Sequence, residues 1–144
     1  MDYRVDLNPT RSVIRLTVTA ETVTLELAED IYWHLSEVAS SGGPYAAIYD
    51  LSAAKNTTMP TESVRYFAHR RPSVPMGRKQ VVVGKERHIY GLARLFQMSS
   101  EAMGGEIEVV HTLEEAYDIV GARPEDFTEC LVCPREVILP LPTP

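Results

Sequence analysis

The chain has 144 residues, of which 44% are hydrophobic and 24% are charged, and this composition is typical of one soluble globular domain. No apolar run approaches the roughly 20 residues that a membrane-spanning helix needs, and the start, Met1–Arg4, lacks the apolar core of a signal peptide. With only Cys130 and Cys133, the fold is not expected to depend on a disulfide. We predict a cytoplasmic protein without a membrane span.

The net charge of −6 is unevenly distributed along the chain. Residues 1–68 and 95–144 carry net charges of −4 and −8, whereas residues 69–94 hold seven basic and one acidic side chain, a net charge of +6. If these basic side chains cluster in space, they form a positive region on an acidic body. A phosphate-binding face would fit this charge, but no recognised DNA- or RNA-binding module accompanies it. We therefore expect an acidic protein surface, rather than nucleic acid, as the partner.

Two short segments at the start of the chain predict an antiparallel hairpin. Residues 3–7 alternate weakly between apolar and polar side chains, and residues 12–19 alternate clearly. The turn signal Asn8-Pro9-Thr10 separates them. Because the connection is this short, the two strands are expected to pair with each other.

Residues 23–39 predict the first helix, with Thr24 as a suitable N-cap. The opposite face of this helix carries Trp33 among acidic side chains. Trp33 could lean on a neighbouring side chain, or it could contact a second subunit or partner, since tryptophan is enriched at interface hot spots. The apolar residues that recur at helical spacing are Leu27, Ile31, Leu35 and Val38.

The stretch Tyr45–Ser52 predicts a buried strand in the middle of the sheet. Its apolar residues follow the breaker Ser40–Pro44 and do not alternate with polar residues, so both faces of the strand are expected to be covered. Asp50 and Ser52 mark its carboxyl end, where ligands and partners usually dock in open α/β sheets. The same two residues are also common in turns, where they bond to nearby backbone.

The remaining elements alternate between helix and strand. A polar loop over residues 53–59 contains Thr57 and Thr58 and precedes a helix from residue 60 or 61 to Arg71. The order implies an α/β fold: a mixed sheet with an N-terminal antiparallel hairpin followed by alternating helix-strand units, with helices packed on the sheet. The later elements are a strand over 80–83, a helix over 86–103, a strand over 107–110 and a helix that begins with the capping box Thr112–Glu115 and ends at Gly121.

From Ala122 onward the composition changes, since five of the ten prolines lie here. We predict a domain over residues 1–121 and a proline-rich tail over 122–144, with one helical turn around residues 125–130. Cys130 and Cys133 would supply half of a zinc site, but the chain has no second cysteine pair, so two ordinary thiols are expected.

No motif predicts a catalytic centre, a metal site or a cofactor. The turn at Gly84–Arg87 follows a strand and opens a helix, but it lacks the glycine-rich sequence of a phosphate loop or a dinucleotide site. No nucleophile stands beside an evident base, and only Asp50 and His88 are expected near one another at strand ends. We predict a protein that is not an enzyme. The residues expected to bind a ligand or partner are Asp50, Ser52, Thr57, Thr58, Arg70, Arg71, Lys85, Arg87 and His88.

The chain resembles the STAS-type fold of anti-sigma-factor antagonists, and more closely the small bacterial STAS/SEC14-like (SpoIIAA-like) proteins of uncharacterised role. The resemblance covers roughly residues 3–120 and implies the same α/β sheet. Antagonists of that type carry a phosphorylated Ser or Thr at a helix start, within an Asp-Ser-Ser-Gly-like motif. The matching stretch here, Asn56–Thr61, lacks the Asp, the Ser pair and the Gly, although its threonines are chemically suitable acceptors. The motifs that carry the resemblance are Tyr49–Ser52, Val81–Gly84, Tyr90–Arg94 and Val109–Ala116.

We therefore expect a non-enzymatic regulatory or protein-interaction module of STAS-like type, acting as a homodimer with an unknown protein partner. Its expected working surface combines the turn from Asp50 to Thr61 with the basic residues around Arg70, Arg71, Lys85 and Arg87. The alternative is a carrier or sensor of a small apolar or anionic ligand, to which SEC14-like domains are similar. An enzyme that uses Asp50 and His88 is a third hypothesis.

Overall fold

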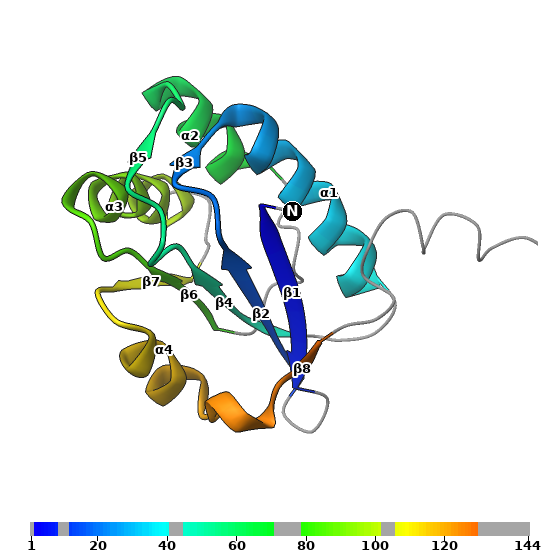
Figure 1. The fold of residues 1–144 in the computed structure, drawn as a ribbon. Coiled ribbons are helices and arrows are strands. Elements are labelled where there is room, and N and C mark those ends of the chain that lie inside the picture. Colours follow the sequence, from blue (N-terminus) through cyan, green and yellow to red (C-terminus); the bar gives the residue numbers. More distant parts are fainter. Residues whose placement is uncertain (1, 9–11, 41–44, 71–78, 102–105, 130–144) are drawn as a thin grey trace, which may run out of the picture.

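The computed structural model describes residues 2–8, 12–40, 45–70, 79–101 and 106–129. In this part of the chain, a six-stranded mixed sheet has helices on both faces (Figure 1). The sheet has the strand order β7-β6-β4-β2-β1-β8. The strands are β1 (Tyr3–Asn8), β2 (Val13–Val18), β3 (Thr22–Val23), β4 (Ala46–Asp50), β5 (Asn56–Thr57), β6 (Gln80–Val83), β7 (Ile107–Val110) and β8 (Thr128–Glu129). The helices are α1 (Leu25–Ser40), α2 (Thr61–His69), α3 (Arg87–Glu101), α4 (Leu113–Val120) and the 3₁₀ helix η1 (Pro124–Asp126).

The predicted hairpin and the parallel core are both confirmed. β1 pairs antiparallel with β2, from Tyr3 opposite Val18 to Asn8 opposite Val13. β2, β4, β6 and β7 then run parallel to one another. β4 lies between β2 and β6, so the stretch predicted as central is an inner strand of the sheet.

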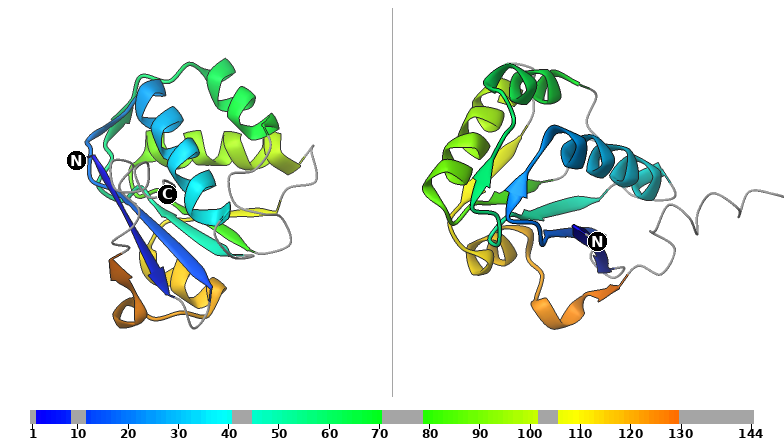
Figure 2. Two further views of the ribbon diagram at one scale, coloured as in Figure 1. Left: turned by 90° about the vertical axis from the view of Figure 1, so that its right-hand side faces the viewer. Right: turned by 45° about the horizontal axis from the view of Figure 1, so that its top comes forward.

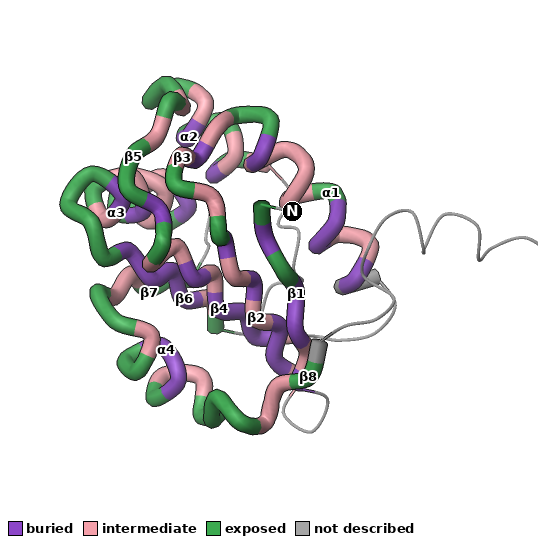
Figure 3. The backbone as a smooth tube through the Cα atoms, viewed as in Figure 1, coloured by how far each residue is buried: buried purple, intermediate pink, exposed green. Residues whose placement is uncertain are grey.

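Helices cover both faces of β4, which explains why its sequence does not alternate. Ala47 packs with α1 residues such as Leu35 on one face, and Ile48 packs with Ala116 of α4 on the other. α1 and α3 share the first face, and α2 lies on α3 away from the sheet (Figures 1 and 2). Buried residues accordingly concentrate along the strands (Figure 3).

The predicted helix signals have the expected geometry. The Thr24 Oγ1 accepts a hydrogen bond from the Leu27 amide at 3.1 Å, as an N-cap should. Thr112 and Glu115 form the reciprocal capping box of α4. Gly121 ends α4 with φ 74°, a left-handed conformation that glycine adopts without steric cost.

Two short pairings were not predicted. β3 and β5 form a small parallel sheet, with Thr22 opposite Asn56, inside segments expected to be helix start and loop. Residues 107–110 form β7 as predicted, but a further strand, β8, follows it in the chain and pairs with β1, Leu7 lying opposite Thr128. Strands of two residues leave no periodic pattern, and this explains why sequence reasoning missed them.

The first residues of the predicted tail, from residue 122 to 129, contact the rest of the fold. Ala122 and Phe127 pack in the cluster beneath the sheet with α4, and η1 takes the place of the helical turn expected around residues 125–130. Arg15 of β2 organises this region. It donates hydrogen bonds to the Asp6 carboxylate and the Tyr117 hydroxyl, each at 2.7 Å, and its guanidinium lies 4.5 Å from the centre of the Phe127 ring. The expected tail from Cys130 onward, with Cys133, lies outside the described residues.

Candidate functional site

The carboxyl ends of the parallel strands bring most of the predicted site residues to one edge of the sheet. Asp50 at the end of β4 lies opposite Val83 at the end of β6, and Val83 lies opposite Val110 at the end of β7. The segments that follow these three strands are therefore neighbours. We call them together the sheet rim, which comprises residues 50–52, 84–88 and 111–112.

Asp50 and Ser52 form a closed turn within the sheet rim. Asp50 is buried, and its Oδ1 accepts a hydrogen bond from the Ser52 amide at 3.0 Å and another from the Ser52 hydroxyl. The Leu51 amide donates to the Val83 carbonyl oxygen at 2.9 Å, which ties the turn to β6. The contacts of Asp50 and Ser52 are thus those of a turn, and the Asp50 carboxylate is hydrogen-bonded within the fold.

The two predicted threonines have different environments. The Thr57 hydroxyl donates to the Val23 carbonyl oxygen at 2.9 Å and accepts from the Met59 amide at 3.0 Å, so it is part of the connection between β3 and β5. Thr58 is exposed, and only its backbone amide is engaged, by the Val23 carbonyl oxygen at 3.1 Å. Of the two hydroxyl groups, that of Thr58 is the accessible one.

The start of α3 presents an exposed group of basic side chains. We call Lys85, Arg87 and His88 the cationic group. All three are exposed, and none makes a side-chain hydrogen bond or an ion pair with another described residue. The positive charges of Lys85 and Arg87 therefore face solvent, with the exposed carboxylate of Glu86 between them in the chain.

A close backbone contact fixes where the cationic group projects. A Cβ atom on Gly84 would lie 3.0 Å from the Tyr90 Cα, so a larger residue here would push the start of α3 away from the end of β6. The Gly84 amide also donates to the Val110 carbonyl oxygen at 3.0 Å, which holds the turn against the end of β7. The start of α3 is thereby set beside His111.

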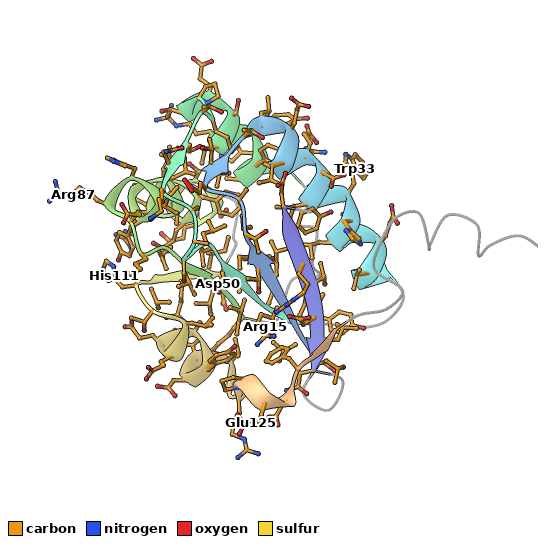
Figure 4. All side chains as sticks on the ribbon, in the orientation of Figure 1. Arg15, Trp33, Asp50, Arg87, His111 and Glu125 are labelled. Atoms are coloured by element: carbon orange, nitrogen blue, oxygen red, sulfur yellow. The ribbon has the colours of Figure 1, made fainter. Side chains whose placement is uncertain are left out.

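Tyr90 and His111 form a flat ring stack next to the cationic group. Their ring centres are 4.0 Å apart and their planes differ by 8°. His111 is exposed and projects on the same side of the molecule as Arg87 (Figure 4). Sequence reasoning missed this pair. The one available signal was the position of His111 directly after a strand, at the edge where functional residues collect.

Arg70 does not join the cationic group, and the single basic surface expected from the sequence is wrong on this point. The Arg70 guanidinium lies within 5.5 Å of four ring centres and is 3.0 Å from the Glu29 carboxylate of α1. Trp33 and Arg87 project on different sides of the molecule in Figure 4. We call the four rings with Arg70 the aromatic patch, and they belong to Tyr32, Trp33, Tyr66 and Phe67.

The remaining predictions concern Arg71, the pair of Asp50 and His88, metal binding and membrane helices. Arg71 lies outside the described residues. Asp50 and His88 share no hydrogen bond or ion pair, so the two are not coupled as an acid-base pair would be. Among the described residues, no group of three or more His, Cys, Asp or Glu side chains is arranged to hold a metal ion. No described helix combines the length and the apolar character required to cross a membrane.

Comparison with protein-family models, with curated proteins and with solved structures gives no significant match.

Proposed function

We propose that this protein is a non-enzymatic regulatory or protein-interaction module of STAS-like type that works as a homodimer. One observation carries the proposal. At the sheet rim the Asp50 carboxylate is bonded within the fold, as is the Thr57 hydroxyl in the nearby loop, whereas the side chains of the cationic group are exposed and make no hydrogen bond or ion pair with other described residues. This arrangement is suited to recognition of a charged surface rather than to proton transfer or nucleophilic attack.

An acidic protein surface is the partner that fits the sheet rim. Lys85 and Arg87 supply fixed positive charges, and the stacked rings of Tyr90 and His111 supply a flat surface beside them. Charged residues at the edge of an interface mainly raise the association rate and set partner choice. The STAS-like order of strands and helices and the turn at Asp50–Ser52 support the assignment to this type of module.

Reversing the charge of the sheet rim tests this proposal. A partner is first captured from the native host with the intact protein, and its affinity is then measured for a variant with Lys85→Glu and Arg87→Glu. The matched control carries Lys79→Glu and Arg123→Glu. Lys79 precedes β6 at the opposite end of the strand, Arg123 follows α4, and both are exposed. Both double variants change the net charge by the same amount.

We expect the rim variant to lose at least about tenfold in affinity, mostly in the association rate, and the control to bind within about twofold of the wild type. Equal losses in the two variants would show that only overall charge matters and would remove the sheet rim as the docking surface. Turnover of a substrate in a broad hydrolase and transferase screen would overturn the non-enzymatic assignment.

A carrier or sensor of a small anionic ligand is the second candidate function. The observation that favours it is the Tyr90–His111 stack beside Lys85 and Arg87, because the uncharged part of a ligand could pack on the rings while its anionic group meets the two cations. Native mass spectrometry of protein purified from its own host tests this function. A bound small molecule that is lost in the Lys85→Glu and Arg87→Glu variant supports it, and repeated absence of any bound molecule counts against it.

A further inference from the structure

Two large aromatic side chains remain exposed on the aromatic patch. Trp33 of α1 is 52% exposed and Tyr66 of α2 is 59% exposed, although both rings lie within 5.5 Å of the Arg70 guanidinium. The two rings therefore belong to one continuous surface that spans both helices. Tryptophan, tyrosine and arginine are the residue types enriched at interface hot spots, and here all three occur together.

The two helices beneath this surface carry opposite charge. α1 contains four carboxylates and no lysine or arginine. α2 together with Arg70 contains two arginines and one carboxylate, Glu62. Within the protomer Glu29 already pairs with Arg70 and Asp30 accepts a hydrogen bond from the Tyr3 hydroxyl, so Glu26 of α1 and Arg65 of α2 are exposed charges of opposite sign that a second molecule can meet.

These two residues lie at different places on their helices. Glu26 lies seven residues before Trp33, which places it on the same stripe of α1, whereas Arg65 immediately precedes Tyr66 and so points about 100° away from it around α2. Both are exposed, and neither makes a side-chain hydrogen bond or an ion pair with another described residue. Each of them is therefore available to a second molecule.

We propose that the aromatic patch is a two-fold interface with a second copy of this chain, in which α1 of each protomer faces α2 of its partner. In a two-fold interface the same surface meets itself rotated, so residue i contacts residue j while j contacts i. In this arrangement Glu26 of one protomer meets Arg65 of the other in two symmetric places, and the exposed rings come together in the middle. The charge complementarity within one patch favours a second copy over an unrelated protein. This inference rests on the homodimer of the proposed function and names its surface.

Truncation of the exposed rings tests the surface. Trp33→Ala and Tyr66→Ala are compared with Met98→Ala, which removes an exposed hydrophobic side chain of α3 (54% exposed) that is not part of the patch. Sedimentation equilibrium over the micromolar range measures dimerisation, and circular dichroism confirms that each variant is folded. We expect the dimer dissociation constant to rise at least about 30-fold for each ring variant and to change less than about threefold for Met98→Ala.

A charge exchange between protomers tests the two-fold arrangement. Glu26→Arg alone and Arg65→Glu alone each place like charges across both halves of the interface, so each purified variant is expected to be mainly monomeric. In a mixture of the two variants, one chain has arginine at positions 26 and 65 and the other has glutamate at both. Every pair between the two chains of a heterodimer is then attractive. We expect heterodimers to form in the mixture with an affinity near that of the wild type. Absence of rescue in the mixture would overturn the proposed interface.

The outcomes separate this inference from the proposed function. A dimer that persists in both ring variants leaves the homodimer in place but removes the aromatic patch as its surface. A wild-type protein that is monomeric throughout the micromolar range overturns both the homodimer and the patch. Binding of an acidic partner at the sheet rim is measured independently, because the variant with Lys85→Glu and Arg87→Glu leaves the aromatic patch intact.

Discussion

The guanidinium of Arg70, directly after α2, lies 3.9 Å from the centre of the Tyr32 ring on α1. Arg70 also donates a hydrogen bond to the Glu29 carboxylate at 3.0 Å, and its side chain is 15% exposed. Burial acts to lower the pKa of Arg70, but the hydrogen bond to Glu29 and the electrostatic attraction of Glu29, Tyr66 and Tyr32 together outweigh it, and the pKa is raised overall. Arg70 therefore remains charged at any pH at which the fold survives, and it links α2 to α1 as a permanent cation.

Replacement of Arg70 by alanine is expected to lower the free energy of unfolding by about 1–2 kcal/mol, because the cation–π contact and the pair with Glu29 are both lost. Arg70→Lys retains the charge but not the planar group that stacks on Tyr32, so it should recover less than half of the loss. Urea denaturation of the two variants measures this. Full recovery by lysine would show that charge alone, rather than ring stacking, links the helices.

A larger loss is expected at Arg15, which pairs with the buried Asp6 carboxylate at 2.7 Å. Arg15→Ala would leave that carboxylate without its principal partner, and removal of one partner of a buried ion pair typically costs about 3–5 kcal/mol. Tyr117→Phe removes only one hydrogen bond to Arg15 and should cost about 1 kcal/mol. Thermal and urea unfolding measure both variants.

Arg4 provides the control for this prediction because it also contacts Asp6, at 3.3 Å, but its side chain is 55% exposed. Exposed ion pairs contribute about 0–1 kcal/mol, so Arg4→Ala should be nearly neutral. If Arg4→Ala and Arg15→Ala destabilised the fold equally, burial of the Arg15 pair would not be the cause of its effect.

Much of the fold could be predicted because its periodic segments are long enough to show their pattern. Leu27, Leu35 and Val38 recur at helical spacing and are buried against the sheet, as predicted. The unbroken apolar run at Ala46–Ile48 predicted an inner strand, and helices on both of its faces explain that run. The capping residues Thr24 and Thr112 also marked where helices begin.

The arrangement of the candidate site was less predictable, because it depends on contacts between residues far apart in the chain. Arg70 belongs to the same basic segment as Lys85, yet Glu29 and Tyr32 of α1 engage it in the aromatic patch. Proximity along a charged segment therefore did not imply proximity in space. The stack of Tyr90 on His111 joins α3 to the end of β7, and no local pattern encodes such a pair.

The two threonines of the loop before α2 are expected to respond differently to substitution. Thr57→Val removes a hydroxyl that bonds to the Val23 carbonyl oxygen and to the Met59 amide, so it should cost about 1 kcal/mol. Thr58→Val changes an exposed side chain and should alter the free energy of unfolding by less than about 0.5 kcal/mol. Chemical denaturation compares the pair. A neutral Thr57→Val would contradict the structural role assigned to its hydroxyl.

Two glycines offer a final matched comparison, because one lies against backbone and the other faces open space. A Cβ at position 84 would meet the Tyr90 Cα at 3.0 Å, and backbone cannot yield as a flexible side chain does, so Gly84→Ala should shift the start of α3 and cost about 1–3 kcal/mol. A Cβ on Gly91, within α3, meets nothing within 4 Å, so Gly91→Ala should stabilise the helix by up to about 1 kcal/mol. Thermal unfolding shows directly whether each variant is less or more stable than the wild type. The shift also displaces Lys85 and Arg87, so Gly84→Ala should weaken partner binding while Gly91→Ala leaves it unchanged. Equal binding by both variants would contradict the role of this turn in positioning the cationic group.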